Sequence, residues 1–295
     1  MLSGLSEVQL FMAKKFALVS GLGLLLSLGK PAMADEASDH YNTGLLLKRE
    51  GKLVEAAAEL NKAIELRPEF AAAHFTLGNL YRQQGHYDKA AVSIEHSLRI
   101  SPKNDLALAN LGAVYLRLDK LDKAVEVLDQ AALSKDDEVS FEALLTLGVV
   151  HRKKGDVVKA VAALKLATEK KPGEAQGWTN LGIALNRTED KEGAVVAFKK
   201  AILLKPGVGE SYFNLGVAHR RLRQVDEAIA AYEKAVSLDP TQAGAYYDLG
   251  ILFSQQKEND KALLAFKNYL KAGGSKLTEK DRKDAEERIA SLGGK

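Results

Sequence analysis

The stretch Ser211–Leu222 reads SYFNLGVAHRRL, and it decides the fold. Tyr212, Leu215 and His219 recur at the spacing of one helical face, so the stretch is predicted to be helical. Gly216 sits inside that helix, although glycine there costs about 0.8–1 kcal/mol relative to alanine. The Leu-Gly pair recurs at Leu77-Gly78, Leu111-Gly112, Leu147-Gly148, Leu181-Gly182 and Leu249-Gly250. A pair that returns in this way indicates internal repeats.

The repeat has a period of 34 residues, apart from one step of 36 that contains the insertion Val139-Ser140. An alanine stands 12 residues after each repeat glycine, and a proline stands 24 residues after five of them. The alignment gives seven units, at residues 37–70, 71–104, 105–138, 141–174, 175–208, 209–242 and 243–276. Each unit is too small to bury its own apolar face, so neighbouring units are expected to stack.

This repeat resembles the tetratricopeptide repeat family, whose pattern is filled in residues 209–242 by Tyr212, Leu215, Gly216, Ala228, Tyr232, Ala235 and Pro240. The resemblance implies an all-α, right-handed superhelical solenoid of seven helix-turn-helix repeats. Position 8 of the first helix is expected to meet position 20 of the second, with small residues at both places allowing close approach. Proline is expected to end the second helix, because its ring cannot continue one. The departures from the pattern include Thr43, Ser97, Asp136 and Gly274.

Both ends of the chain differ from the repeats. Residues 1–34 are predicted to be a signal peptide, because two lysines precede the uncharged apolar run Phe16–Gly29 and Ala32-Met33-Ala34 precedes Asp35. Met12 is an alternative start. We expect export to the periplasm or the medium and no stable membrane span after cleavage; anchoring by an uncleaved segment is the alternative. Residues 277–295 are predicted to form a capping helix with Thr278 as its N-cap, or else a solvated tail.

The composition argues against several functional classes. The chain has no cysteine, and its net charge of +3 falls to +1 without residues 1–34, so nucleic acid is not an expected partner. No nucleophile, phosphate-binding or metalloprotease motif occurs. His74, His151 and His219 fall at positions that pack in this family, and His86 and His96 lack helical metal-ligand spacing. We therefore expect no catalytic residue, no cofactor and no metal, and no enzymatic activity.

The resemblance also implies that positions 2, 5, 6, 9, 12 and 13 of the first helix line a concave groove. Position 6 is short and polar in every unit and includes Asn42, Asn110, Asn180 and Asn214. Position 9 is mostly apolar, and position 13 includes Arg117, Arg187 and Arg221. Position 5 adds the aromatic residues Phe75, Phe213 and Tyr247. These ten residues are the predicted peptide-binding site.

The asparagine row is similar to the asparagine ladder of the O-linked N-acetylglucosamine transferase superhelix, which holds an extended polypeptide. An asparagine amide offers one acceptor and two donors to any peptide backbone. The alternative is that position 6 merely tolerates small polar residues. The arginines would attract an acidic segment or a free carboxylate, unless they only stabilise helix C-termini. The family's carboxylate clamp is excluded, because only Asn79 fits it and Phe75 stands where lysine is needed.

The sequence thus predicts a non-enzymatic scaffold or adaptor of the cell envelope that binds extended polypeptide segments of other proteins in the groove. One alternative is a structural component of an envelope assembly that uses its convex or end faces. An accessory subunit of an envelope enzyme is another. Replacing the four asparagines together would separate groove binding from the structural role.

Overall fold

The computed structural model describes residues 29–293, and all regular structure within this range is helical. The chain divides into two compact units, one ending at Lys120 and the other beginning at Leu121. The first unit contains α2 (Gly29–Arg49), α3 (Leu53–Leu66), α4 (Ala71–Gln83), α5 (Tyr87–Ile100) and α6 (Asp105–Arg117). The second contains α7 (Leu121–Ala131), α8 (Asp137–Lys154), α9 (Val157–Lys170), α10 (Ala175–Leu185), α11 (Lys191–Leu204), α12 (Gly209–Arg221), α13 (Val225–Leu238), α14 (Ala243–Gln255), α15 (Asn259–Gly273), the 3₁₀ turn η1 (Gly274–Lys276) and α16 (Glu279–Ser291).

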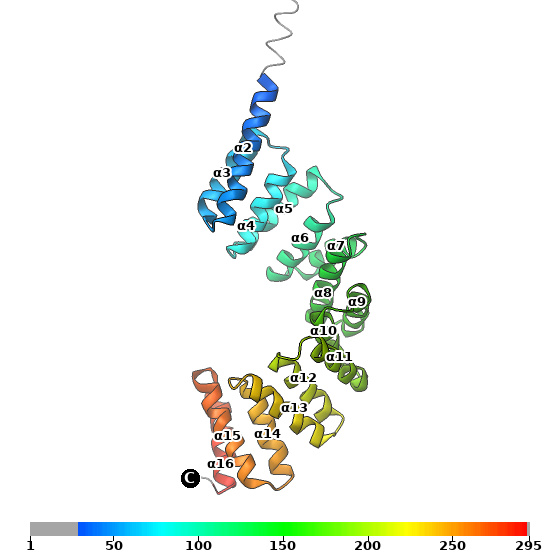
Figure 1. The fold of residues 1–295 in the computed structure, drawn as a ribbon, viewed down its shortest axis with the longest axis vertical. Helices are drawn as coiled ribbons and strands as arrows, with labels where there is room; N and C mark the ends of the chain where they lie inside the picture. The colour runs from blue at the N-terminus through cyan, green and yellow to red at the C-terminus, as the bar shows by residue number, and fades with distance from the viewer. Residues whose placement is uncertain (1–28, 294–295) are drawn as a thin grey trace, which may run out of the picture. The chain divides into compact units, whose positions relative to one another are not determined.

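Within each unit the helices pair into antiparallel hairpins that stack in chain order (Figure 1). The hairpins are α2/α3 and α4/α5 in the first unit, and α8/α9, α10/α11, α12/α13 and α14/α15 in the second. The third repeat supplies α6 to one unit and α7 to the other. First helices of neighbouring repeats touch as well, α8 with α10 and α10 with α12. The predicted all-α repeat fold is confirmed.

The recurring glycine makes room for a large side chain on the second helix. A Cβ placed on Gly182 would lie 2.6 Å from Cε1 of Phe198, and one on Gly78 would lie 2.5 Å from Cγ1 of Ile94. Both side chains stand at position 24, whereas position 20 contributes a backbone carbonyl, that of Ala90, at 3.2 Å from the Gly78 Cβ position. The expected contact between positions 8 and 20 is therefore only part of the packing. The same relation to position 24 holds for Gly44, Gly148, Gly216 and Gly250, which face Leu60, Leu164, Tyr232 and Phe266.

In six of the seven repeats, the residue at position 15, in the turn between the two helices, has a left-handed backbone conformation. Glycine fills this place at Gly155, with a φ of 86°, but Arg223 adopts a φ of 60° without being glycine. The other left-handed residues at position 15 are Gly51, Gly85, Asp119 and Lys257. The fifth repeat has Glu189 there and does not adopt a positive φ. Its first helix α10 has 11 residues, against 13 in α12, because it ends before the turn begins.

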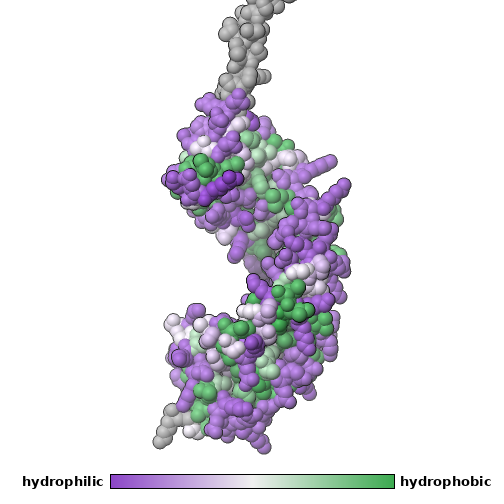
Figure 2. All heavy atoms as spheres, viewed as in Figure 1, coloured by the Kyte–Doolittle hydropathy of each residue, from purple (hydrophilic) through white to green (hydrophobic). Residues whose placement is uncertain are grey.

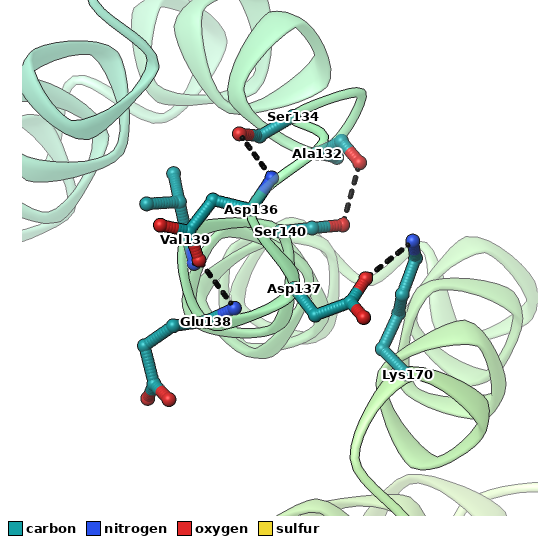
Figure 3. A network of polar contacts seen from close by, with 8 residues as sticks. All are labelled: Ala132, Ser134, Asp136, Asp137, Glu138, Val139, Ser140 and Lys170. Carbon is teal, nitrogen blue, oxygen red and sulfur yellow. Dashed lines mark hydrogen bonds and ion pairs between the residues drawn. The ribbon is translucent and has the colours of Figure 1, made fainter.

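The two-residue insertion is absorbed at the start of α8, as Figure 3 shows. Helix α7 has only 11 residues and α8 has 18, so the second helix ends early and the next one begins early. Asp136, which stands where other repeats have proline, caps α8 by accepting the Glu138 N–H at 2.9 Å. The Ser140 hydroxyl donates to the Ala132 carbonyl at 2.7 Å. Val139 and Ser140 are buried, so the junction is packed and capped rather than loose.

The C-terminal helix α16 covers the last repeat. Its N-cap is Thr278, whose Oγ1 accepts the Asp281 N–H at 3.1 Å. Ala285 is fully buried, and Ile289 and Leu292 pack against the apolar cluster of α13, α14 and α15. At the other end, α2 begins at Gly29, upstream of the predicted first repeat residue Ala37. The predicted signal peptide falls largely on residues 1–28, which lie outside the described residues.

Candidate functional site

The first helices expose one side to solvent in both units. We call the residues at positions 6, 9, 12 and 13 of these helices the first-helix face. Position 9 is half-buried in every repeat, and position 13 is exposed in every repeat. In the second unit, the position 9 residues Val149, Ile183, Val217 and Ile251 form an apolar row. Figure 2 shows hydrophobic surface in the region of α10, within a mostly hydrophilic exterior.

The asparagines of position 6 lie on this face with unused amides. Asn110, Asn180 and Asn214 are half-buried and Asn42 is exposed, and no hydrogen bond within residues 29–293 engages any of their side chains. The other members of the row are occupied. The Thr146 hydroxyl donates to the Glu142 carbonyl at 2.8 Å in the preceding helical turn. Thr76 and Asp248 contact Tyr41 and Arg220, respectively. The position 6 asparagines therefore differ from their neighbours in keeping their hydrogen-bonding groups free.

The arginines of position 13 lie at the same end of each first helix. Arg117 and Arg221 are exposed last residues of α6 and α12, where a cation is favoured by the helix dipole. Arg187 is exposed too, but it lies beyond the end of α10 and so outside the helix. No ion pair engages these three guanidinium groups in the described part of the chain. These three arginines, which we call the basic row, are thus available to an anionic ligand.

Arg152 at position 12 was not among the predicted site residues. It is half-buried, and burial together with the nearby charge of Arg187 lowers the pKa of its guanidinium. The equivalent residue two repeats later, Arg220, has its Nε 3.9 Å from Oδ1 of Asp248 on α14. Position 12 thus faces position 6 of the next repeat. That register could have been found from the sequence alone, because Arg152 and Asn180 stand at the same spacing as Arg220 and Asp248.

A buried tyrosine lies beneath the Arg220–Asp248 pair. Tyr232 is fully buried, and its hydroxyl makes no hydrogen bond to any described residue. Burial raises the pKa of Tyr232, and the charge of Asp248 raises it further. The tyrosine fills the space left by Gly216, as position 24 does in the other repeats. We therefore assign it to packing.

The predicted aromatic residues divide between two roles. Phe75 is half-buried on α4 and makes no ring contact within the described residues. Phe213 packs over Tyr232, with ring centroids 5.8 Å apart. Tyr247 donates its hydroxyl to Asp284 of α16 at 2.8 Å, and Arg288 of the same helix lies over its ring. Tyr247 therefore holds the C-terminal helix in place, a role that its repeat position did not reveal.

The turn of the fifth repeat is the other feature that the sequence reasoning missed. Asn186 follows α10 and is 8% exposed, and its side-chain oxygen accepts no hydrogen bond from the described residues. The Thr188 hydroxyl donates to the Leu185 carbonyl at 2.7 Å and accepts the Asp190 N–H at 3.1 Å. Asp190 in turn accepts the Gly193 N–H at 2.9 Å and caps α11. These bonds fix the turn that carries Asn186 and Arg187.

Comparison with known families identifies the repeats. Three family profiles, one described as TPR repeat and two as tetratricopeptide repeat, together match most of the chain, at residues 44–85 and 221–257, 81–147, and 145–208. The chain belongs to the tetratricopeptide repeat (TPR) family. A comparison with curated proteins finds no match.

Solved structures show the same fold. The C-terminal part of a TPR repeat-containing protein from Cytophaga hutchinsonii superposes with a TM-score of 0.68 at 16% identity, over 84% of this chain and 99% of that one. A TPR protein from Parabacteroides merdae gives 0.62 at 19%, over 88% and 100%. YrrB, described as a TPR protein with an unusual peptide-binding site, gives 0.54 at 20%, over 68% and 97%. At these identities the likeness concerns the fold alone.

Metal-ligand clusters and membrane-spanning helices are both absent from the described part of this TPR chain. No group of three or more histidine and carboxylate side chains within residues 29–293 is arranged to hold a metal ion. Among the described helices, none is both long and apolar enough to cross a membrane. The buried histidines His151 and His219 lie at packing positions, and the His219 ring is 2.6 Å from the Gln224 side chain.

Proposed function

We propose that this TPR chain is a non-enzymatic scaffold of the cell envelope, and that its first-helix face binds extended polypeptide segments of other proteins. The unpartnered amides of Asn180 and Asn214 carry the proposal. An extended peptide presents N–H and C=O groups that such amides can both donate to and accept from, whatever the side chains. Val149, Ile183 and Val217 would cover apolar side chains of the ligand. The envelope location depends on the signal peptide predicted for residues 1–34.

Paired asparagine substitutions test this role. Peptides selected from a random display library on the wild-type protein would be measured by fluorescence anisotropy. Asn180→Ala with Asn214→Ala should weaken binding about tenfold, since each hydrogen bond contributes about 0.5–1.5 kcal/mol. The matched control is Asn61→Ala with Asn268→Ala, because these asparagines are also half-buried and unpartnered but lie on second helices. Equal affinity in both double variants would refute binding at the asparagine row.

The basic row should act mainly on association. Exposed arginines speed the encounter with an acidic ligand, and salt screens that attraction. Reversing Arg117, Arg187 and Arg221 to glutamate should slow association at low salt and leave the helix content unchanged. If association of an acidic peptide is unaffected, the arginines serve only the helix ends. Export is checked separately by intact mass from the native host, which should show a mature chain beginning at Asp35.

A second candidate is a structural role on the opposite side, using the second helices. Val158 is 82% exposed on α9 and Leu203 is 82% exposed on α11, which is unusual for large apolar side chains. A protein that packs against these helices would make the chain a component of an assembly. Val158→Lys with Leu203→Lys should then abolish the assembly, whereas the asparagine variants should leave it intact.

A further inference from the structure

One position 12 arginine in the second unit lacks the partner that its equivalent has. Arg220 on α12 pairs with Asp248, which stands at position 6 of the next repeat. Arg152 on α8 has the same register to Asn180, which is neutral. No hydrogen bond or ion pair engages the Arg152 guanidinium anywhere in residues 29–293. The chain thus places a carboxylate beside one arginine and a neutral amide beside the other.

The arginine is also not a freely solvated surface cation. Arg152 is half-buried, and a second guanidinium, that of Arg187, is close enough for the two charges to repel. Partly burying a cation and placing a like charge beside it are both unfavourable unless an anion is bound. The helix dipole accounts for a basic residue at the end of α8, but it does not account for the approach of Arg187 from the next repeat.

The irregular turn of the fifth repeat also carries an unpartnered acceptor, one residue before Arg187. Asn186 directly precedes Arg187, and its side-chain oxygen is buried without a donor from the described residues. A buried carbonyl oxygen that lacks a donor is destabilising, so a ligand N–H would remove that penalty. Thr188 and Asp190 hold the turn by their own hydrogen bonds. The turn that carries Arg187 therefore also holds an unpartnered acceptor.

We propose that Arg152 and Arg187 together bind a carboxylate of the polypeptide ligand, with the Asn186 oxygen accepting a peptide N–H beside it. This anchor rests on the proposed function, since it fixes where on the first-helix face the ligand is held. The ligand carboxylate supplies Arg152 with the negative charge that Asp248 supplies to Arg220. It comes from an acidic side chain or from the C-terminus of the partner, and both present the same group to a planar guanidinium.

Small carboxylates serve as the probes. Arginine side-chain N–H signals of the full chain would be followed by NMR at low salt during titration with N-acetyl-leucine, which carries an α-carboxylate. N-acetyl-glutamate α-amide carries the carboxylate on the side chain, and N-acetyl-leucinamide carries none. Saturable shifts of Arg152 and Arg187 are expected with one or both acids and not with the amide. The tighter acid identifies the source, and equal shifts with the amide would overturn the proposal.

Two substitutions test the register without disturbing the fold. Arg152→Gln should weaken binding of the acid about tenfold or more, since a charge-assisted pair is lost. The matched control is Arg99→Gln, an exposed arginine in the last turn of the second helix α5, which should leave the affinity unchanged. Asn180→Asp should weaken binding of the acid to the same degree, because the new carboxylate would pair with Arg152 as Asp248 pairs with Arg220. Asn61→Asp makes the same change on the second helix α3, away from the first-helix face, and should have no effect.

The outcomes separate the anchor from the wider role. If selected peptides depend on Asn180 and Asn214 but neither Arg152→Gln nor Asn180→Asp changes acid binding, the anchor is wrong and peptide binding stands. If no selected peptide depends on those asparagines, the proposed function fails by itself. Circular dichroism of each variant, matching the wild type, would show that a loss of binding is not a loss of fold.

Discussion

Replacing Gly182 with alanine should destabilise the second unit, although alanine is the better helix former. The new Cβ would lie 2.6 Å from Cε1, 2.8 Å from Cδ1 and 2.8 Å from Cζ of Phe198. Phe198 is fully buried, so its ring cannot move into solvent. Overpacking of this kind costs about 1–3 kcal/mol, and the gain in helix propensity returns about 0.8–1 kcal/mol. The net loss should be about 1 kcal/mol.

A double-mutant cycle isolates the cause. Phe198→Ala alone should cost about 3–5 kcal/mol, because it leaves a cavity. In that background the clash is gone, so Gly182→Ala should stabilise by about 1 kcal/mol, which gives a coupling of about 2 kcal/mol. Urea unfolding followed by fluorescence suits the measurement, because the only tryptophan, Trp178, lies on the same helix. Gly207→Ala, where nothing lies within 4 Å, is the control. An equal penalty in both backgrounds would refute the packing explanation.

Three other changes test individual features of the second unit. Burial lowers the pKa of His151, so the unfolded chain binds a proton more readily than the folded chain does, and the free energy of unfolding should fall as pH drops below about 6.5. His151→Phe should make the free energy of unfolding less dependent on pH, as measured by urea midpoints from about pH 7.5 to about pH 5.5. Asp136→Ala removes the cap of α8 and should cost about 1 kcal/mol, with faster amide exchange confined to the first turn of that helix. Tyr247→Phe loses the bond to Asp284 and should speed exchange throughout α16 by roughly tenfold, whereas unchanged exchange would mean that apolar packing alone holds the helix.

The fold could be predicted from the sequence because seven units repeat the same arrangement of packing residues. A glycine that returns at a fixed place, followed by alanine and proline, specifies a hairpin whichever unit is considered. What the period could not reveal is which side chain uses the glycine's space. Position 24 varies between leucine, isoleucine, phenylalanine and tyrosine, and only contact distances show that all of them fill the same gap.

The candidate site was predicted less completely, for the opposite reason. Its rows are repeated, but its chemistry depends on departures from the repeat. Asp248 differs from the asparagines by one functional group, and the turn after α10 differs by the absence of a left-handed residue. Tyr247 fits the aromatic pattern of position 5 but bonds to Asp284, because the non-repeat helix α16 packs against the seventh repeat. An alignment of the repeats with one another does not show such contacts with neighbouring elements.

The way α7 and α8 share the insertion bears on how this array can change in length. Two residues added within a helix would turn everything after them by about 200°, because each residue turns the helix by about 100°. Here the shortened α7 and the early start of α8 take up the extra residues before Phe141, and Gly148 still faces Leu164 as its counterparts do. The boundary between hairpins thus resets the phase of the chain. Residues can be inserted between two hairpins without changing which side chains of the following repeats face the core. The same insertion one turn later, inside α8, would rotate those side chains away from the core.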